Sequence, residues 1–108
     1  MIKVTFHKEH YRVTIEGHAH SGDVGHDLVC AAVSILSYTL AADLELMEAR
    51  GQLRSFTADM QPGRAEIYCT PVRNMQAIVS LVFDSVCTGF SILAKDYPQN
   101  ICMKVFGG

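Results

Sequence analysis

Three histidines, three glycines and one cysteine fall within fourteen residues of this chain, in the stretch GHAHSGDVGHDLVC at positions 17–30. Thiolate and imidazole serve both in nucleophilic catalysis and in zinc binding. His18 and Cys30 are candidates for a base and a nucleophile, because a nearby imidazole favours the thiolate and can later protonate a leaving amine. The stretch therefore indicates either acyl transfer or metal binding.

Four side chains of the stretch could act together as zinc ligands: His18, His20, His26 and Cys30. Neutral imidazole and thiolate are preferred donors in tetrahedral zinc sites. The spacing H-x-H-x5-H-x3-C is not a common closed-site pattern, however, and a glycine-rich loop would have to be held rigid around the ion. We therefore expect no metal and no other cofactor, with zinc binding kept as an alternative.

Two more polar residues flank the cysteine. Asp27 lies in the expected first helical turn, where a carboxylate either caps backbone N–H groups or orients a catalytic imidazole. Ser34 follows Cys30 by four residues and hence lies on the same helix face. Its hydroxyl either steadies the nucleophile or bonds to the preceding helical turn.

The glycines of the stretch are Gly17, Gly22 and Gly25. They interrupt the periodic patterns on both sides and allow backbone angles that other residues avoid. We expect segment 19–25 to be mobile and to close over a bound peptide. His20 and His26 are expected to be polar residues of this substrate loop.

Alternation of apolar and polar residues predicts four strands in two hairpins, 2–6 with 11–15 and 56–60 with 65–69. A polar turn closes the first hairpin, and the sequence Gln61-Pro62-Gly63-Arg64 closes the second. The same alternation predicts a last strand over 101–105.

Apolar residues at three- and four-residue spacing predict two amphipathic helices. The first follows the quoted stretch and stops at Gly51. Cys30 is thus expected in its first or second turn, where free N–H groups and the helix dipole favour a thiolate. The second helix is expected to begin with Thr70 as N-cap and Pro71 in the first turn, and to end before Pro98.

The predicted element order is ββαββαβ in a single domain over residues 1–108. Strands that alternate in polarity are covered on one face, and two helices with one apolar stripe each can cover that face. We therefore expect an α+β fold, a two-layer sandwich of a mainly antiparallel sheet with both helices on one face.

The composition excludes several classes of protein. The chain has 108 residues, 49% of them hydrophobic, and a formal net charge of −2, which suits a compact domain and not a polybasic nucleic-acid binder. No basic head precedes a long apolar segment at the start, so we expect a cytoplasmic protein without a membrane anchor. The four cysteines form no CxxC pair, and we expect free thiols, with Cys69, Cys87 and Cys102 in the core.

The tripeptide GHA at 17–19 and the segment HDLVCAAVS at 26–34, separated by a glycine-containing loop, resemble the signature of the ribosomal-processing cysteine protease family, Prp. The resemblance covers the whole chain in length and element order. It implies a bacterial cytoplasmic endopeptidase with Cys30 as nucleophile and His18 as general base. Asp27 and Ser34 match motif positions whose roles are less settled.

The resemblance also implies a substrate, the short N-terminal extension of the large-subunit ribosomal protein L-twenty-seven. The cut in such substrates follows a phenylalanine and precedes a small residue. Together with the apolar strand over 101–106 near a sheet edge, the resemblance favours a homodimer. Two alternatives stay open: a ribosome-assembly binding protein with an inert Cys30, and a zinc-binding domain.

Overall fold

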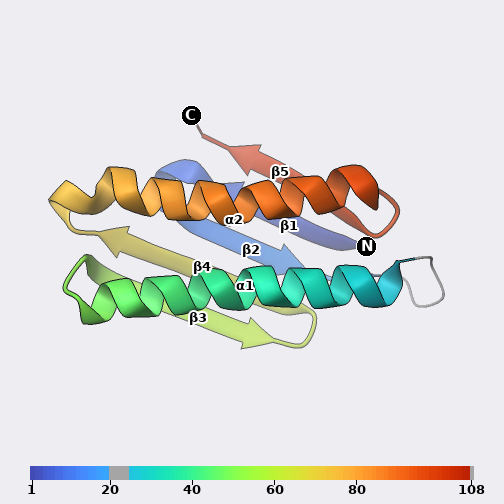
Figure 1. The fold of residues 1–108 in the computed structure, drawn as a ribbon, viewed down its shortest axis with the longest axis horizontal. Coiled ribbons are helices and arrows are strands. Elements are labelled where there is room, and N and C mark those ends of the chain that lie inside the picture. Colours follow the sequence, from blue (N-terminus) through green and yellow to red (C-terminus); the bar gives the residue numbers. More distant parts are fainter. Residues whose placement is uncertain (20–24, 108) are drawn as a thin grey trace.

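The computed structural model describes residues 1–19 and 25–107. Seven main elements follow one another along the chain: β1 (Ile2–His7), β2 (Arg12–Glu16), α1 (His26–Ala49), β3 (Leu53–Gln61), β4 (Arg64–Pro71), α2 (Gln76–Asp96) and β5 (Ile101–Phe106) (Figure 1). The predicted ββαββαβ order is confirmed.

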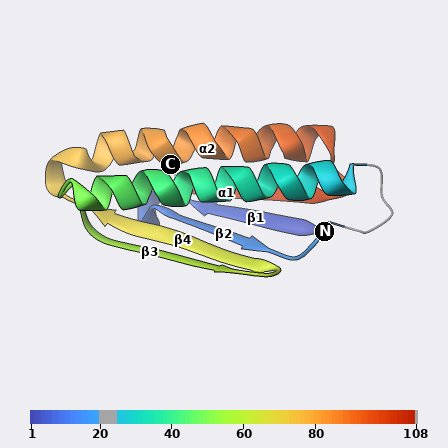
Figure 2. The same ribbon diagram turned by 60° about the horizontal axis from the view of Figure 1, so that its bottom comes forward.

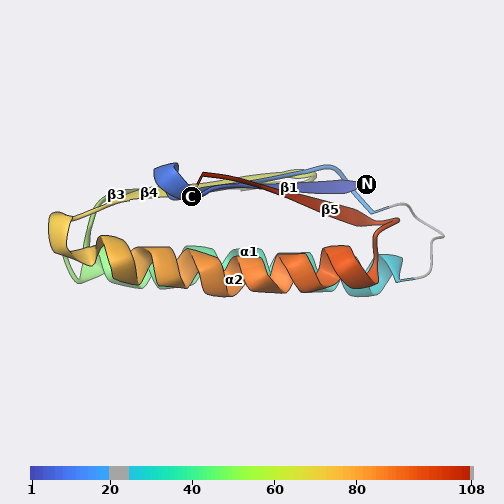
Figure 3. The same ribbon diagram turned by 90° about the horizontal axis from the view of Figure 1, so that it is seen from above.

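The strands form one sheet in the order β3-β4-β2-β1-β5. Three neighbouring pairs are antiparallel, and β5 runs parallel to β1. Figure 3 shows both helices in one layer on one face of this sheet. The α+β sandwich is confirmed, with a mainly antiparallel sheet as expected.

The core lies between the sheet and the helix layer. Val4 and Phe6 of β1 and Val13 of β2 point into it, as the alternating pattern predicts. Phe83 of α2 is fully buried, and its ring stacks on that of Phe6 with centroids 5.8 Å apart. This contact packs α2 against β1.

The second helix begins later than expected. Thr70 and Pro71 are the last residues of β4, and Pro71 is paired with Leu53 of β3. A short 3-10 turn over Arg73–Met75 then leads into α2. The expected N-cap at Thr70 is wrong, because pairing with β3 continues to Pro71, beside a register irregularity between Leu53 and Ser55 where a strand proline is tolerated.

The two predicted glycine turns are confirmed. Gly51 follows the end of α1 with φ +74°, and Gly63 lies in the two-residue turn between β3 and β4 with φ +76°. Both angles belong to the left-handed region that glycine adopts without steric cost. Figure 2 shows the β3–β4 hairpin lying below α1.

Both helices are long and apolar enough to cross a membrane when only length and composition are considered. This is weak evidence, because the core helix of a soluble protein has the same properties. In this fold the two helices lie side by side across one sheet face (Figure 1). The expectation of no membrane anchor stays a prediction.

Candidate active site

Helix α1 begins at His26, which places Cys30 in its second turn. Gly25 occupies the N-cap position with φ +87°, and its carbonyl accepts a hydrogen bond from the Val29 N–H at 2.8 Å. A Cβ on Gly25 would lie 2.6 Å from Cε1 of Tyr97, at the end of α2. The helix start is thus held by a close contact that only glycine permits.

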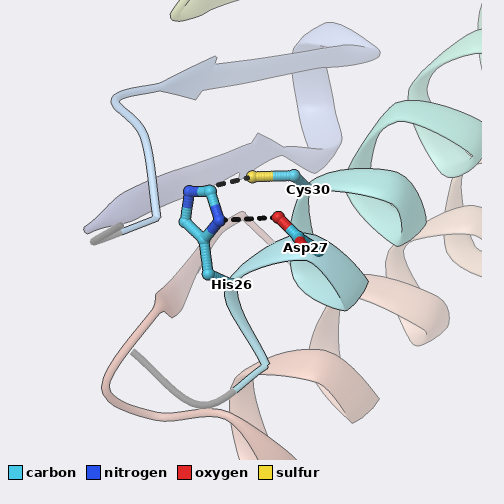
Figure 4. A network of polar contacts seen from close by, with 3 residues as sticks. All are labelled: His26, Asp27 and Cys30. Atoms are coloured by element: carbon cyan, nitrogen blue, oxygen red, sulfur yellow. Dashed lines mark hydrogen bonds and ion pairs between the residues drawn. The ribbon is translucent and has the colours of Figure 1, made fainter. Parts of the chain in front are cut away.

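The sulfur of Cys30 contacts an imidazole from its own helix. Sγ of Cys30 lies 3.9 Å from Nε2 of His26, and Nδ1 of the same ring lies 3.0 Å from Oδ1 of Asp27 (Figure 4). Cys30 and His26 are half-buried, whereas the Asp27 side chain is exposed. The three side chains form a line of polar contacts that ends at the sulfur.

These positions differ from the expected ones in two respects. His26 is the first residue of α1 and not a loop residue, because the helix starts directly after Gly25. The N-cap has no side-chain hydrogen bond, and the carboxylate of Asp27 contacts an imidazole instead. Of the two roles considered for Asp27, the geometry favours orientation of an imidazole, that of His26.

His18 lies just beyond the end of β2. The Gly17 N–H donates to the Gly63 carbonyl at 2.9 Å, and the Met1 nitrogen donates to the His18 carbonyl at 2.7 Å. The exposed imidazole of His18 lies over Gly63, so closely that a Cβ there would be 3.0 Å from its Cε1 and nearer still to its Nε2. Backbone hydrogen bonds and the turn glycine therefore position this ring.

A pocket of about 410 Å³ connects the two sequence-predicted residues, since both His18 and Cys30 line it. Ser34 and Tyr38 of α1 also line it, as does the hairpin segment 60–65. Among the residues that the structure describes, His26 is the imidazole that contacts the Cys30 sulfur. His18 makes no hydrogen bond with that sulfur.

Part of the expected site lies outside the described residues. His20 and Gly22 belong to segment 20–24, and so does most of the expected mobile loop over 19–25. Within residues 1–19 and 25–107, no three histidine, cysteine, aspartate or glutamate side chains are grouped so as to hold a metal ion. The expected ligands His18, His26 and Cys30 form no such group among these residues, and His20 lies outside them, so the zinc alternative stays open.

The sequence alone did not place the hairpin tip at this site. Met60, Pro62 and Arg64 line the pocket together with Tyr38, yet no motif connects them with Cys30. The Pro-Gly turn signalled a hairpin, but only the pairing of β4 with β2 brings its tip beside His18.

The other cysteines lie in different surroundings. Cys69 and Cys87 are buried, and burial raises the pKa of the Cys69 thiol to about 11 and that of the Cys87 thiol to about 12. The carboxylate of Asp84 also raises the Cys87 pKa. Cys102 is half-buried on the edge strand β5. The expectation that it lies in the core is wrong, because an edge strand has a neighbouring strand on one side only.

We expect iodoacetamide at about neutral pH to modify Cys30 and to leave Cys69 and Cys87 unmodified, because the thiolate is the reactive form. Both buried thiols stay protonated well above that pH. Peptide mapping by mass spectrometry after brief treatment would locate the label. Equal labelling of Cys87 and Cys30 in the folded protein would contradict this prediction.

Comparison with known proteins identifies the family. The model of the cysteine protease Prp family matches residues 1–102. The chain belongs to this family. It is therefore a cysteine peptidase, and the expected resemblance is confirmed.

Solved structures agree with this fold. SMU.848 from Streptococcus mutans is 28% identical, with a TM-score of 0.66 over 97% of this chain and 91% of that one. The ribosomal processing protease Prp from Staphylococcus aureus with a covalently linked product peptide is 22% identical, with a TM-score of 0.70 over 98% and 100%. The same S. aureus protein with a substrate peptide gives 19% identity and a TM-score of 0.70 over 97% of both chains. No curated protein matches the chain significantly.

Proposed function

We propose that this protein is a cytoplasmic endopeptidase that removes the N-terminal extension of the large-subunit ribosomal protein L-twenty-seven. One observation carries the proposal: His18 and Cys30 line the same pocket in a chain of the Prp cysteine protease family. The S. aureus relative is a ribosomal processing protease seen with substrate and product peptides, which supports a peptide substrate of the same kind here.

In the proposed reaction the Cys30 thiolate attacks the scissile carbonyl carbon, and the carbonyl oxygen takes up the negative charge. First-turn N–H groups of α1, which lack partners within the helix, are the proposed donors to that oxygen. The C–N bond then breaks, and the leaving amine receives a proton from His18, which solvent protonates beforehand. Water next attacks the thioester, one of its protons returns to His18 and the other passes to solvent, and the new carboxylate and the Cys30 thiolate are released.

Recognition of the peptide rests on apolar contacts. Ile15, Val33 and Met60 contribute apolar side chains to the pocket, which suits a phenylalanine before the cut. With a net charge of −2, electrostatic steering of a basic extension is weak.

The test is incubation of the purified protein with a peptide that spans the extension, with and without prior iodoacetamide treatment. Cleavage that alkylation abolishes supports the proposal, and an otherwise identical peptide with aspartate in place of the phenylalanine should stay intact. Binding without cleavage would favour the ribosome-assembly binding protein instead. Stoichiometric zinc by native mass spectrometry would favour the metal-binding alternative.

We also propose that the protein is a homodimer. β5 is an edge strand, and its residues Val105 and Phe106 are about half exposed, at 52% and 51%. An uncovered apolar edge strand favours pairing with a second chain. Light scattering coupled to size exclusion would give the mass, and a monomer at all concentrations tested would reject the dimer.

Substitution of Gly63 is expected to displace the His18 ring and to leave the Cys30 sulfur untouched. Gly63→Ala places a methyl group where the His18 ring lies and should lower the rate of cleavage by about tenfold or more, since small displacements of a proton-transfer group are costly. Cleavage of the peptide under saturating conditions measures the effect.

Gly51→Ala is the matched control. Gly51 has nearly the same positive φ as Gly63, but nothing lies within 4 Å of the position of its Cβ. Both variants carry similar left-handed strain, on the order of 1 kcal/mol. Equal cleavage rates for Gly63→Ala and Gly51→Ala would show that the contact between Gly63 and the His18 ring does not affect catalysis.

A further inference from the structure

The proposed function leaves one imidazole at the sulfur without a role. His26 lies four residues before Cys30, so both side chains project from the same face of α1. Nε2 of His26 lies 3.9 Å from Sγ, within reach of a long sulfur hydrogen bond. Such contacts are often long in a free enzyme and shorten in the substrate complex.

The contact between Asp27 and the other ring nitrogen of His26 determines the tautomer of the ring. The tautomer in turn decides whether the nitrogen that faces the sulfur carries a lone pair. An ionised carboxylate can only accept, so Oδ1 of Asp27, 3.0 Å from Nδ1, is paired with an N–H at that nitrogen. In the neutral ring Nε2 is then the acceptor and points at Cys30. After protonation both ring nitrogens are donors, one to the carboxylate and one to the sulfur. The same arrangement therefore serves both protonation states.

We propose that His26, oriented by Asp27, takes up the proton of the Cys30 thiol in the free enzyme, so that the nucleophile is formed before the peptide binds. This inference rests on the proposed function, because it takes Cys30 as the nucleophile. The S–H bond breaks, the electron pair stays on sulfur, and an N–H bond forms at Nε2. No other reactant is needed, and an imidazolium–thiolate pair results.

The two histidines then divide the chemistry. His26 keeps its proton and stabilises the thiolate, whereas His18, across the pocket, exchanges protons with the leaving amine and with water. His26 touches the reacting sulfur and is a catalytic residue in this scheme. Asp27 acts through His26 and is a positioning residue.

Several other groups face this pair and share its electrostatic environment. Arg64 at the start of β4 and His18 after β2 line the same pocket, and both favour negative charge on the sulfur when protonated. Tyr38 lines the pocket from α1, and Tyr97 contacts Gly25 at the helix start. Among the described residues Asp27 is the carboxylate in contact with the His26 ring.

The test follows alkylation of Cys30 by iodoacetamide in the free protein, with the rate measured by peptide mapping between about pH 5 and pH 10. His26→Gln is compared with wild type, with Asp27→Asn, and with His18→Gln as the matched replacement of the other imidazole. His26→Gln should slow alkylation on the order of tenfold near pH 6, where few unassisted thiols are ionised. The difference should vanish near pH 10, where bulk base ionises the thiol.

His18→Gln should lose peptide cleavage but slow alkylation near pH 6 less than His26→Gln does, since His18 makes no hydrogen bond with the sulfur. Asp27→Asn should fall between wild type and His26→Gln. A larger decrease in His18→Gln than in His26→Gln would overturn the inference. Wild-type alkylation of His26→Gln at every pH would overturn the inference. An equal decrease at all pH values would also overturn it, since that result indicates altered exposure of the sulfur. Retained cleavage by Cys30→Ala would instead reject the proposed function, so the two failures are distinguishable.

Discussion

Cys30→Ala is expected to abolish peptide cleavage, with a loss of at least about 10³-fold, because no other group can form the acyl-enzyme. Alanine is a good helix former, and Cys30 lies within α1, so the helix should persist. Peptide binding should be nearly unchanged, since only the sulfur is removed from the pocket. Cleavage by liquid chromatography and binding by calorimetry measure the two effects separately.

Cys87→Ala is the matched control for removal of a thiol. Cys87 is buried in α2 and does not line the pocket, so its replacement should leave cleavage in place. The small cavity should lower the free energy of unfolding by about 1 kcal/mol. A Cys30→Ala variant that cleaves as fast as Cys87→Ala would end the assignment of Cys30 as nucleophile.

His18→Ala is expected to lower the rate of cleavage by about 10²-fold or more, the usual contribution of a general acid–base group. The backbone hydrogen bonds that hold this segment involve Gly17 N–H and the His18 carbonyl, so they survive the substitution. Single-turnover kinetics would show whether formation of the acyl-enzyme is the slowed step.

His10→Ala provides the control for loss of an imidazole. His10 is exposed in the 3-10 turn after β1 and does not line the pocket, so its replacement should leave the rate unchanged. Unchanged cleavage by His18→Ala would remove His18 from the mechanism. Bound zinc in the wild type that is lost in His18→Ala would favour the metal-binding alternative.

The sequence by itself determined the elements and the two principal candidates. Alternation over 2–6 and three- and four-residue spacing after Cys30 are local consequences of strand and helix geometry, and they predict those elements without knowledge of the rest of the chain. The GHA and HDLVCAAVS segments carried the family resemblance that the match over residues 1–102 confirms. The start of α2 was misplaced because an N-cap signal at Thr70 competes with sheet pairing that the sequence does not show.

Only the tertiary structure decided how the site is assembled. The pairing of β2 with β4 joins residues about fifty positions apart and brings Gly63 beneath His18, a contact that no local pattern encodes. The contact between His26 and Cys30 was hidden for a different reason: four-residue spacing brings two side chains together only if the helix already includes both. Gly25 packs against Tyr97 at the end of α2, and α1 begins directly after Gly25, at His26. Because the helix then includes both His26 and Cys30, His26 is the imidazole that contacts the sulfur.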